Sequence, residues 1–162
     1  MTIIGIDPGL ATVGYGVVNA VNGKYNPIEY GAIITKPKQL LENRLKQIYD
    51  ELTDILKRNK IDNAAVEELF FNTNQKTAVD VCQARGVILL ALKQQNIDIY
   101  EYTPLQVKQS VVGYGRAEKQ QVMYMTKLML KLNEMPKPDD TADALAIAMC
   151  HGNHIMHRIR GI

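Results

Sequence analysis

The chain has 162 residues, of which 46% are hydrophobic and 22% are charged, and its formal net charge is +2. This length and composition are typical of one globular domain with a substantial core. No apolar run is long enough to cross a bilayer, and the start lacks the basic and apolar regions of a secretory signal. We therefore expect a cytoplasmic protein that does not contact a membrane.

The distribution of charged and sulfur-containing residues narrows the class of protein further. The segments "VKQSVVGYGRAEKQQ" and "HRIRGI" are basic, while several acids lie at the ends of apolar runs. Acidic positions in a basic field suit an enzyme that holds metal ions and a polyanion together. Cys82 and Cys150 lie in apolar helical contexts and are predicted to be small buried side chains rather than a disulfide or a zinc site.

The first half of the chain reads as three strands followed by a helix. Strands are predicted over residues 3–7, 14–20 and about 24–35, and Asn-Gly in "VNGK" is a strong signal for a hairpin turn. A helix is predicted over about 40–60, where apolar residues recur at the spacing of one helical face. These residues are Leu41, Leu45, Ile48, Leu52, Ile55 and Leu56.

Strands and helices then alternate to the end of the chain. The segments "NAAVEELFF" and "IDIYEYT" read as strands on either side of a helix over about 75–95. Three more helices are predicted, over residues 104–111, 118–132 and 140–149. An antiparallel meander followed by alternating elements gives an α/β fold with a mixed five-stranded sheet flanked by helices. We assign residues 1–151 to this domain and 152–162 to a basic, flexible tail.

Four carboxylates stand out because each lies at the end of a buried element. Asp7 ends the first strand, Glu67 follows the apolar run "AAV", and Asp140 and Asp143 open the last helix on one face. Structural roles are also open to them. Asp-Pro-Gly is a good turn sequence, and Asp139 or Asp140 can serve as a helix N-cap.

The chemistry of such a cluster favours a divalent metal. Buried carboxylates that lie close together repel and stay ionised only beside cations, and no lysine or arginine adjoins these acids in sequence. Oxygen ligands suit Mg²⁺ or Mn²⁺, and a pair of such ions about 4 Å apart is the standard device for displacement at a phosphodiester. His151, His154 and His157 are expected to be surface residues, with metal contact by His151 or His154 as the weaker alternative.

Four segments together resemble crossover-junction endodeoxyribonucleases of the RuvC type, in order from residue 3 to about 151. They are "GIDPGLATVGYGVV", "AVEELFFNTNQKTAVDVCQARG", "YTPLQVKQSVVGYGRAEKQQV" and "DDTADALAIAMCH". The resemblance implies a ribonuclease-H-like fold and a homodimer. It also implies symmetric nicking of four-way (Holliday) junction DNA in recombination and repair. Two Mg²⁺ ions per subunit, replaceable by Mn²⁺, and work beside a branch-migration motor of the RuvA–RuvB type in the bacterial nucleoid are implied as well.

The resemblance also implies roles for single residues. Asp7, Glu67, Asp140 and Asp143 correspond to the metal-binding catalytic acids, although some relatives use histidine at the position of Asp140. Phe70 corresponds to an aromatic that stacks near the junction centre, while Phe71 beside it leaves open which of the two is exposed. Lys108 and Lys119 correspond to residues that hold the DNA backbone.

The basic segment around "VVGYG" supports DNA binding independently of the family resemblance. Lys108, Arg116 and Lys119 flank this segment, whose glycines let the backbone approach a phosphate closely.

The helix over 75–95 has an apolar second half, "VILLALKQQ", so it is buried on more than one side. It is either the central helix of the domain or the contact with a second subunit, and the resemblance favours the dimer.

Two other classes of protein remain open from the sequence. The segment "DPGLATVGYG" also resembles the phosphate loop of sugar kinases and chaperone ATPases, which normally need two such halves where this chain has room for one. A DNA-binding protein that kept the fold without catalysis is the other alternative. Loss of one or more acids would mark that class, and all four are present.

Overall fold

The structure, a computed structural model, describes residues 1–69 and 75–160, with side chains for 1–69 and 78–156. A mixed five-stranded sheet forms its centre, in the order β3-β2-β1-β4-β5. The first three strands are an antiparallel meander, β4 is parallel to β1, and β5 is parallel to β4, as predicted. The strands are β1 (Thr2–Asp7), β2 (Thr12–Val21), β3 (Lys24–Ile34), β4 (Asn63–Glu67) and β5 (Asp98–Tyr102).

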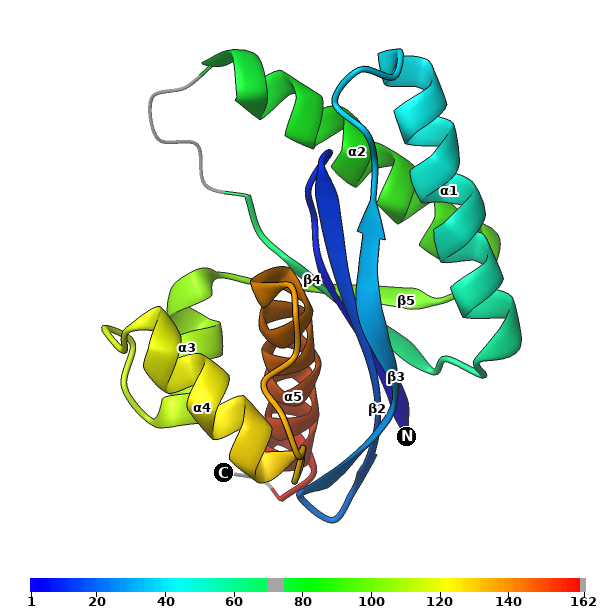
Figure 1. Ribbon diagram of the computed structural model, residues 1–162. Helices are drawn as coiled ribbons and strands as arrows, with labels where there is room; N and C mark the ends of the chain where they lie inside the picture. The colour runs from blue at the N-terminus through cyan, green and yellow to red at the C-terminus, as the bar shows by residue number, and fades with distance from the viewer. Residues whose placement is uncertain (70–74, 161–162) are drawn as a thin grey trace.

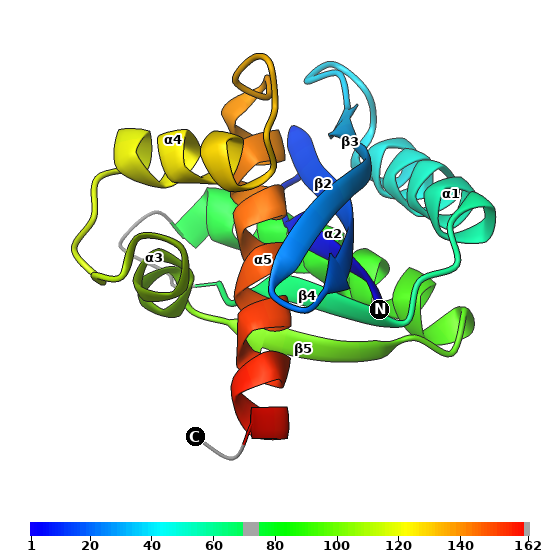
Figure 2. The same ribbon diagram turned by 90° about the horizontal axis from the view of Figure 1, so that it is seen from below.

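Helices cover both faces of the sheet (Figures 1 and 2). The helices α1 and α2 lie on one face, and α3, α4 and α5 lie on the other. Each face has its own apolar core, as the near-continuous hydrophobic runs of a sheet buried on both sides require. The helices are α1 (Leu41–Arg58), α2 (Gln75–Gln94), α3 (Pro104–Val112), α4 (Lys119–Met129) and α5 (Asp139–Arg160).

The predicted hairpin turn between β2 and β3 is confirmed. Asn22 and Gly23 have φ values of 51° and 78°, the left-handed conformation that a tight hairpin with two central residues needs. Within the described ranges, no helix has both the length and the apolar content that a membrane crossing requires.

The helix α5 packs against β1 and β2 with almost no space between the two backbones. A Cβ atom added to Gly5 would lie 2.0 Å from the carbonyl oxygen of Ala144, and one added to Gly14 would lie 2.0 Å from that of Asp140. Any side chain at these two positions would push the helix away from the sheet. Glycine is therefore required here by close approach, the usual reason for glycine inside a strand.

The last helix is longer than the sequence predicts, because polar residues past Met149 find partners in the domain. His151 is buried, with Nε2 at 3.1 Å from Asn63 Nδ2 and Nδ1 at 2.7 Å from the Tyr102 hydroxyl. Asn153 accepts a hydrogen bond from the Tyr25 hydroxyl at 2.5 Å. The assignment of residues 152–162 to a separate tail stays a prediction, and these contacts count against a boundary at residue 151.

Two expectations about single side chains are wrong. His151 was expected at the surface, but it is buried. Burial lowers the pKa of the ring to about 4, so the ring is neutral at pH 7. His154 is exposed, as expected. Both cysteines are free, and Cys150 is buried as predicted, but Cys82 is exposed because it lies on the outer face of α2.

Gly5→Ala is expected to destabilise the domain by about 3 kcal/mol, because the new methyl group meets helix backbone that cannot move aside alone. Gly31→Ala on β3 is the matched control, since the atoms nearest to its methyl group belong to the side chain of Tyr15, with the hydroxyl oxygen at 3.0 Å, and not to a helix backbone. Urea unfolding of both variants measures the difference. Equal stability of the two variants would contradict the close contact of α5 with the sheet.

Candidate active site

Strand pairing brings Asp7 and Glu67 together. The neighbouring strands β1 and β4 run parallel with Ile6 opposite Val66, so the next residue of each strand is Asp7 or Glu67. Side chains alternate along a strand. Ile6 and Val66 face the α1–α2 core, so Asp7 and Glu67 point to the face that α5 covers. Both acids are half-buried.

The first turns of α5 add two more acids to the same place. Gly14 is the register partner of Asp7 across the β1–β2 ladder, and the backbone of Asp140 lies directly on Gly14. Asp143 follows less than one turn later and is half-buried. Asp139 and Asp140 also lie in the first turn of α5, where the helix dipole favours a carboxylate. The structure thus brings all four predicted acids to one end of the sheet.

The pKa values of these acids show how closely they interact. Burial, then Glu67, Asp143 and Asp140, raise the pKa of Asp7 to about 8, with Lys119 opposing. Burial and the charge of Asp143 raise the pKa of Glu67 to about 7, against the opposing charges of Lys119 and Lys108. Burial also raises the pKa of Asp143, although its hydrogen bond with Lys119 lowers it. Near neutral pH the site therefore retains a proton, held mainly by Asp7.

Lys119 is the counter-cation of this cluster. Its ammonium nitrogen lies 3.0 Å from Asp143 Oδ2 and 3.5 Å from Asp139 Oδ2. Sequence reasoning found no cation next to the acids because Lys119 comes from the start of α4, more than 20 positions earlier in the chain. The contact with Asp139 was not anticipated either, since Asp139 had been considered only as a helix cap.

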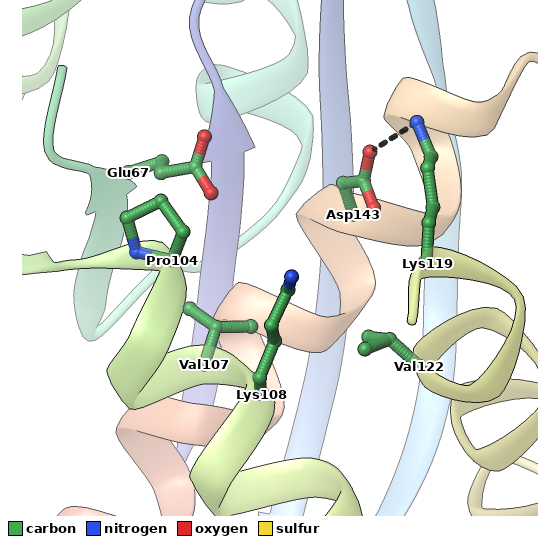
Figure 3. A pocket seen from close by; sticks show the side chains of 7 residues that line it. All are labelled: Glu67, Pro104, Val107, Lys108, Lys119, Val122 and Asp143. Carbon is green, nitrogen blue, oxygen red and sulfur yellow. Dashed lines mark ion pairs between the residues drawn. The ribbon is translucent and has the colours of Figure 1, made fainter. Parts of the chain in front are cut away.

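A cavity of about 270 Å³ opens beside two of the acids (Figure 3). Lys108 on α3 points into it between Glu67 and Asp143, and Lys119 closes the far side through its ion pair. Apolar side chains and charged groups of both signs line it together, which suits a sugar–phosphate backbone. The lining residues are Glu67, Pro104, Val107, Lys108, Lys119, Val122 and Asp143.

The acids interact but do not converge on one point. Among the described residues, no three acidic, histidine or cysteine side chains lie close enough together to hold a metal ion. Like charges repel, and the ion pair with Lys119 holds Asp143 to one side of the cluster. The donor set nevertheless fits a hard divalent cation, since it offers carboxylate oxygens alone and already holds one ammonium group.

The other residues predicted to contact DNA do not line this cavity or lie outside the described residues. Arg116 is exposed in the turn between α3 and α4 and is not among the residues that line the cavity. Gly113 ends α3 in the left-handed conformation, so helix termination explains this glycine without a phosphate. Phe70 and Phe71 lie outside the described residues.

Sequence reasoning missed the residues that hold the site together. Gly5 and Gly14 set the position of α5, and therefore of Asp140 and Asp143, yet neither was considered as a packing residue. A signal existed, because glycines inside an otherwise apolar strand pattern indicate close approach of another backbone.

Comparison with known structures defines the class of fold as ribonuclease-H-like, as expected. The chain superposes on a Thermus thermophilus RuvC structure with a TM-score of 0.90 and 34% identity, covering 98% of this chain and 97% of that one. A structure of T. thermophilus RuvC in complex with a Holliday junction substrate gives a TM-score of 0.91 and 35% identity, over 96% and 94% of the two chains.

The sequence assigns the family. The model of the crossover junction endodeoxyribonuclease RuvC family matches residues 3–151. A crossover junction endodeoxyribonuclease RuvC of Halothermothrix orenii is 58% identical over 153 residues, which are 94% of this chain and 93% of the relative. The chain belongs to the RuvC family, and the resemblance read from the four sequence segments is confirmed.

Asp7→Asn is expected to stabilise the metal-free protein at high pH and not at low pH. The folded protein holds a proton on Asp7 up to a pKa of about 8, against 3.8 as the reference value, so ionisation costs stability as pH rises between these values. Urea unfolding in a chelator at pH 4 and pH 8.5 measures the effect. We expect little difference at pH 4 and a gain of roughly 2–4 kcal/mol at pH 8.5.

Asp54→Asn, at an exposed position on α1, is the control and should show no such trend. A gain for Asp7→Asn that is the same at both pH values would contradict the electrostatic crowding of Asp7.

Proposed function

We propose that this chain is an endonuclease that resolves four-way DNA junctions by symmetric nicking, with Mg²⁺ as cofactor and Mn²⁺ as a substitute. The observation that carries the proposal is the meeting of four acids and two lysines at one end of the sheet. The family supports it, since its members are named crossover junction endodeoxyribonucleases and a relative was solved with a Holliday junction substrate.

The acids are proposed to hold two divalent cations per subunit. Asp7, Glu67, Asp140 and Asp143 supply oxygen donors, and the proton on Asp7 and the ammonium of Lys119 now offset their charge. Bound divalent cations supply an activated water and stabilise the leaving oxygen at a phosphodiester. Asp7 would have to be ionised to serve as a ligand.

The two lysines are proposed to hold the scissile phosphate. Lys108 lies in the cavity between Glu67 and Asp143, where it reaches a strand placed over the acids. Lys119 would hold the other side of the phosphate, because bound divalent cations would neutralise Asp143 in place of the present ion pair. Its ammonium group is then available to a phosphate oxygen, where it offsets charge in the transition state.

Other DNA contacts remain proposals from the family. Arg116 is exposed at the α3–α4 turn, where it can bind the backbone of an arm of the junction. Phe70 is proposed to stack on a base near the junction centre.

The outer face of α2 supports the proposed homodimer. Val79 and Leu90 are 56% and 53% exposed, and Cys82 and Gly86 lie between them on the same side of the helix. A continuous small and apolar stripe on an exposed helix indicates a protein contact. Two-fold pairing would supply two active sites for two symmetric cuts. Work beside a RuvA–RuvB branch-migration motor in the bacterial cytoplasm, near the nucleoid, completes the proposal.

Asp7→Asn is expected to reduce cleavage of a synthetic four-way junction by at least roughly a hundredfold in Mg²⁺, because the site loses a charged ligand while the DNA contacts stay. A gel assay of paired nicks on four-way, Y-shaped and linear DNA, with and without Mg²⁺, measures cleavage, and a mobility-shift assay measures binding. Asp54→Asn should cut at the parental rate. Parental cleavage by Asp7→Asn would remove Asp7 from the catalytic set.

Leu90→Asp is expected to convert the dimer to a monomer, because it places a charge in the apolar α2 stripe. Leu128→Asp on α4 is the matched control, since Leu128 is also half exposed, at 50% against 53% for Leu90. Sedimentation velocity of the parental protein and both variants measures the mass. A monomeric parental protein, or a dimer that survives Leu90→Asp, would be evidence against this interface.

A further inference from the structure

A second cavity, of about 380 Å³, lies on the other side of the acidic cluster from the Lys108 cavity. Asp140 lines this second cavity, whereas Asp143, three positions later on α5, lines the first. The start of α5 therefore stands between two cavities. The second one is lined by Gly9, Leu10, Ala11, Thr12, Arg44, Asp80, Val81 and Asp140.

Arg44 on α1 is the cationic side chain of this second cavity, and a short hydrogen-bond relay fixes its position. Its Nε donates to the Thr35 hydroxyl at 2.8 Å, and that hydroxyl donates to the carbonyl oxygen of Leu10 at 2.6 Å. The Thr35 amide also donates to the carbonyl oxygen of Ala11 at 3.0 Å. The guanidinium is thus tied to the loop that follows Asp7.

The relay uses one of the five N–H groups of the guanidinium. Among the side chains of residues 1–69 and 78–156, no carboxylate forms an ion pair with Arg44, although Asp80 and Asp140 line the same cavity. Arginine held at Nε keeps a planar pair of N–H groups, which matches two oxygens of a phosphate.

The surface next to Arg44 continues the positive charge outward. Lys36 and Lys38 are exposed on the segment that leads into α1, and the N-cap residue of α1, Leu40, makes no side-chain cap. Glu42 in the first turn offsets part of this charge. Asp80 and Asp140 make the cavity unfavourable for a free anion, so a phosphate would remain there as part of a strand that is also held elsewhere.

We propose that Arg44 binds a backbone phosphate of the DNA on the side of the acidic site opposite Lys108 and Lys119. A strand that crosses the acids then has a cationic contact on each side of the bond that is cut. Contacts on both sides fix the direction of the strand and keep the scissile phosphate over the acids. This inference rests on the proposed function and adds a second binding subsite to it.

Junction binding by Arg44→Met tests the contact, in an Asp7→Asn background with Mg²⁺ so that the DNA stays intact. We expect binding about tenfold weaker near 0.1 M salt, and a slope of log K against log salt that is smaller by about 1. Arg44→Lys should keep the slope. Lys57→Met, which removes a charge at the far end of α1, is the matched control and should change neither quantity.

Thr35→Val separates binding from positioning, because it breaks the relay and leaves the charge of Arg44. It should keep the salt slope that Arg44→Met loses. The contact is overturned if Arg44→Met binds with the parental affinity and slope. A parental protein that neither binds nor cuts junctions overturns the proposed function itself, and the Arg44 contact with it.

A second measurement needs no variant of Arg44 and so does not depend on its folding. Uncharged methylphosphonate linkages are placed one at a time along the cut strand, and binding by the Asp7→Asn protein is measured. We expect loss of affinity at linkages on both sides of the cut bond. Sensitivity on one side alone would overturn the second subsite.

Discussion

The contact between the α5 backbone and the strands β1 and β2 determines the rest of the site. Gly5 and Gly14 leave no side chain between helix and sheet, so the carbonyl oxygens of Ala144 and Asp140 lie against the strands. Strand alternation turns Asp7 and Glu67 to the same face. Four acids from three separate parts of the chain therefore meet through backbone geometry.

This geometry holds like charges where they repel. Burial and this repulsion raise the pKa values of Asp7 and Glu67, and Lys119 offsets part of the repulsion through its ion pair with Asp143. Stability lost at such a cluster is the usual cost of a site prepared for cations. The same residues would serve the proposed reaction, since Asp7 and Asp143 would hold the cations and Lys119 would contact a phosphate. Close packing of α5 on Gly5 and Gly14 fixes the positions of the acids, and the proposed divalent cations would offset their charge.

Local patterns predicted the sheet and the acids well, because their causes are local. Asn22-Gly23 sets the hairpin, apolar periodicity sets α1, and Asp7 and Glu67 end apolar runs. The errors came from contacts distant in sequence. The predicted last helix ends at Met149, yet the helix continues and His151 contacts Asn63 and Tyr102 in the interior. The pairing of Lys119 with Asp143 and the approach of α5 to Gly14 depend on tertiary packing, which no sequence period encodes.

The central claim is that the acids at the end of the sheet close around divalent cations that displace the Lys119 ion pair. Anomalous diffraction from crystals of the unaltered chain grown with Mn²⁺ tests it most directly. We expect peaks within about 2.2 Å of carboxylate oxygens of Asp7, Glu67 and Asp143, with Lys119 moved away from Asp143. An intact Lys119–Asp143 pair with no peak between these acids, at saturating Mn²⁺, would contradict it.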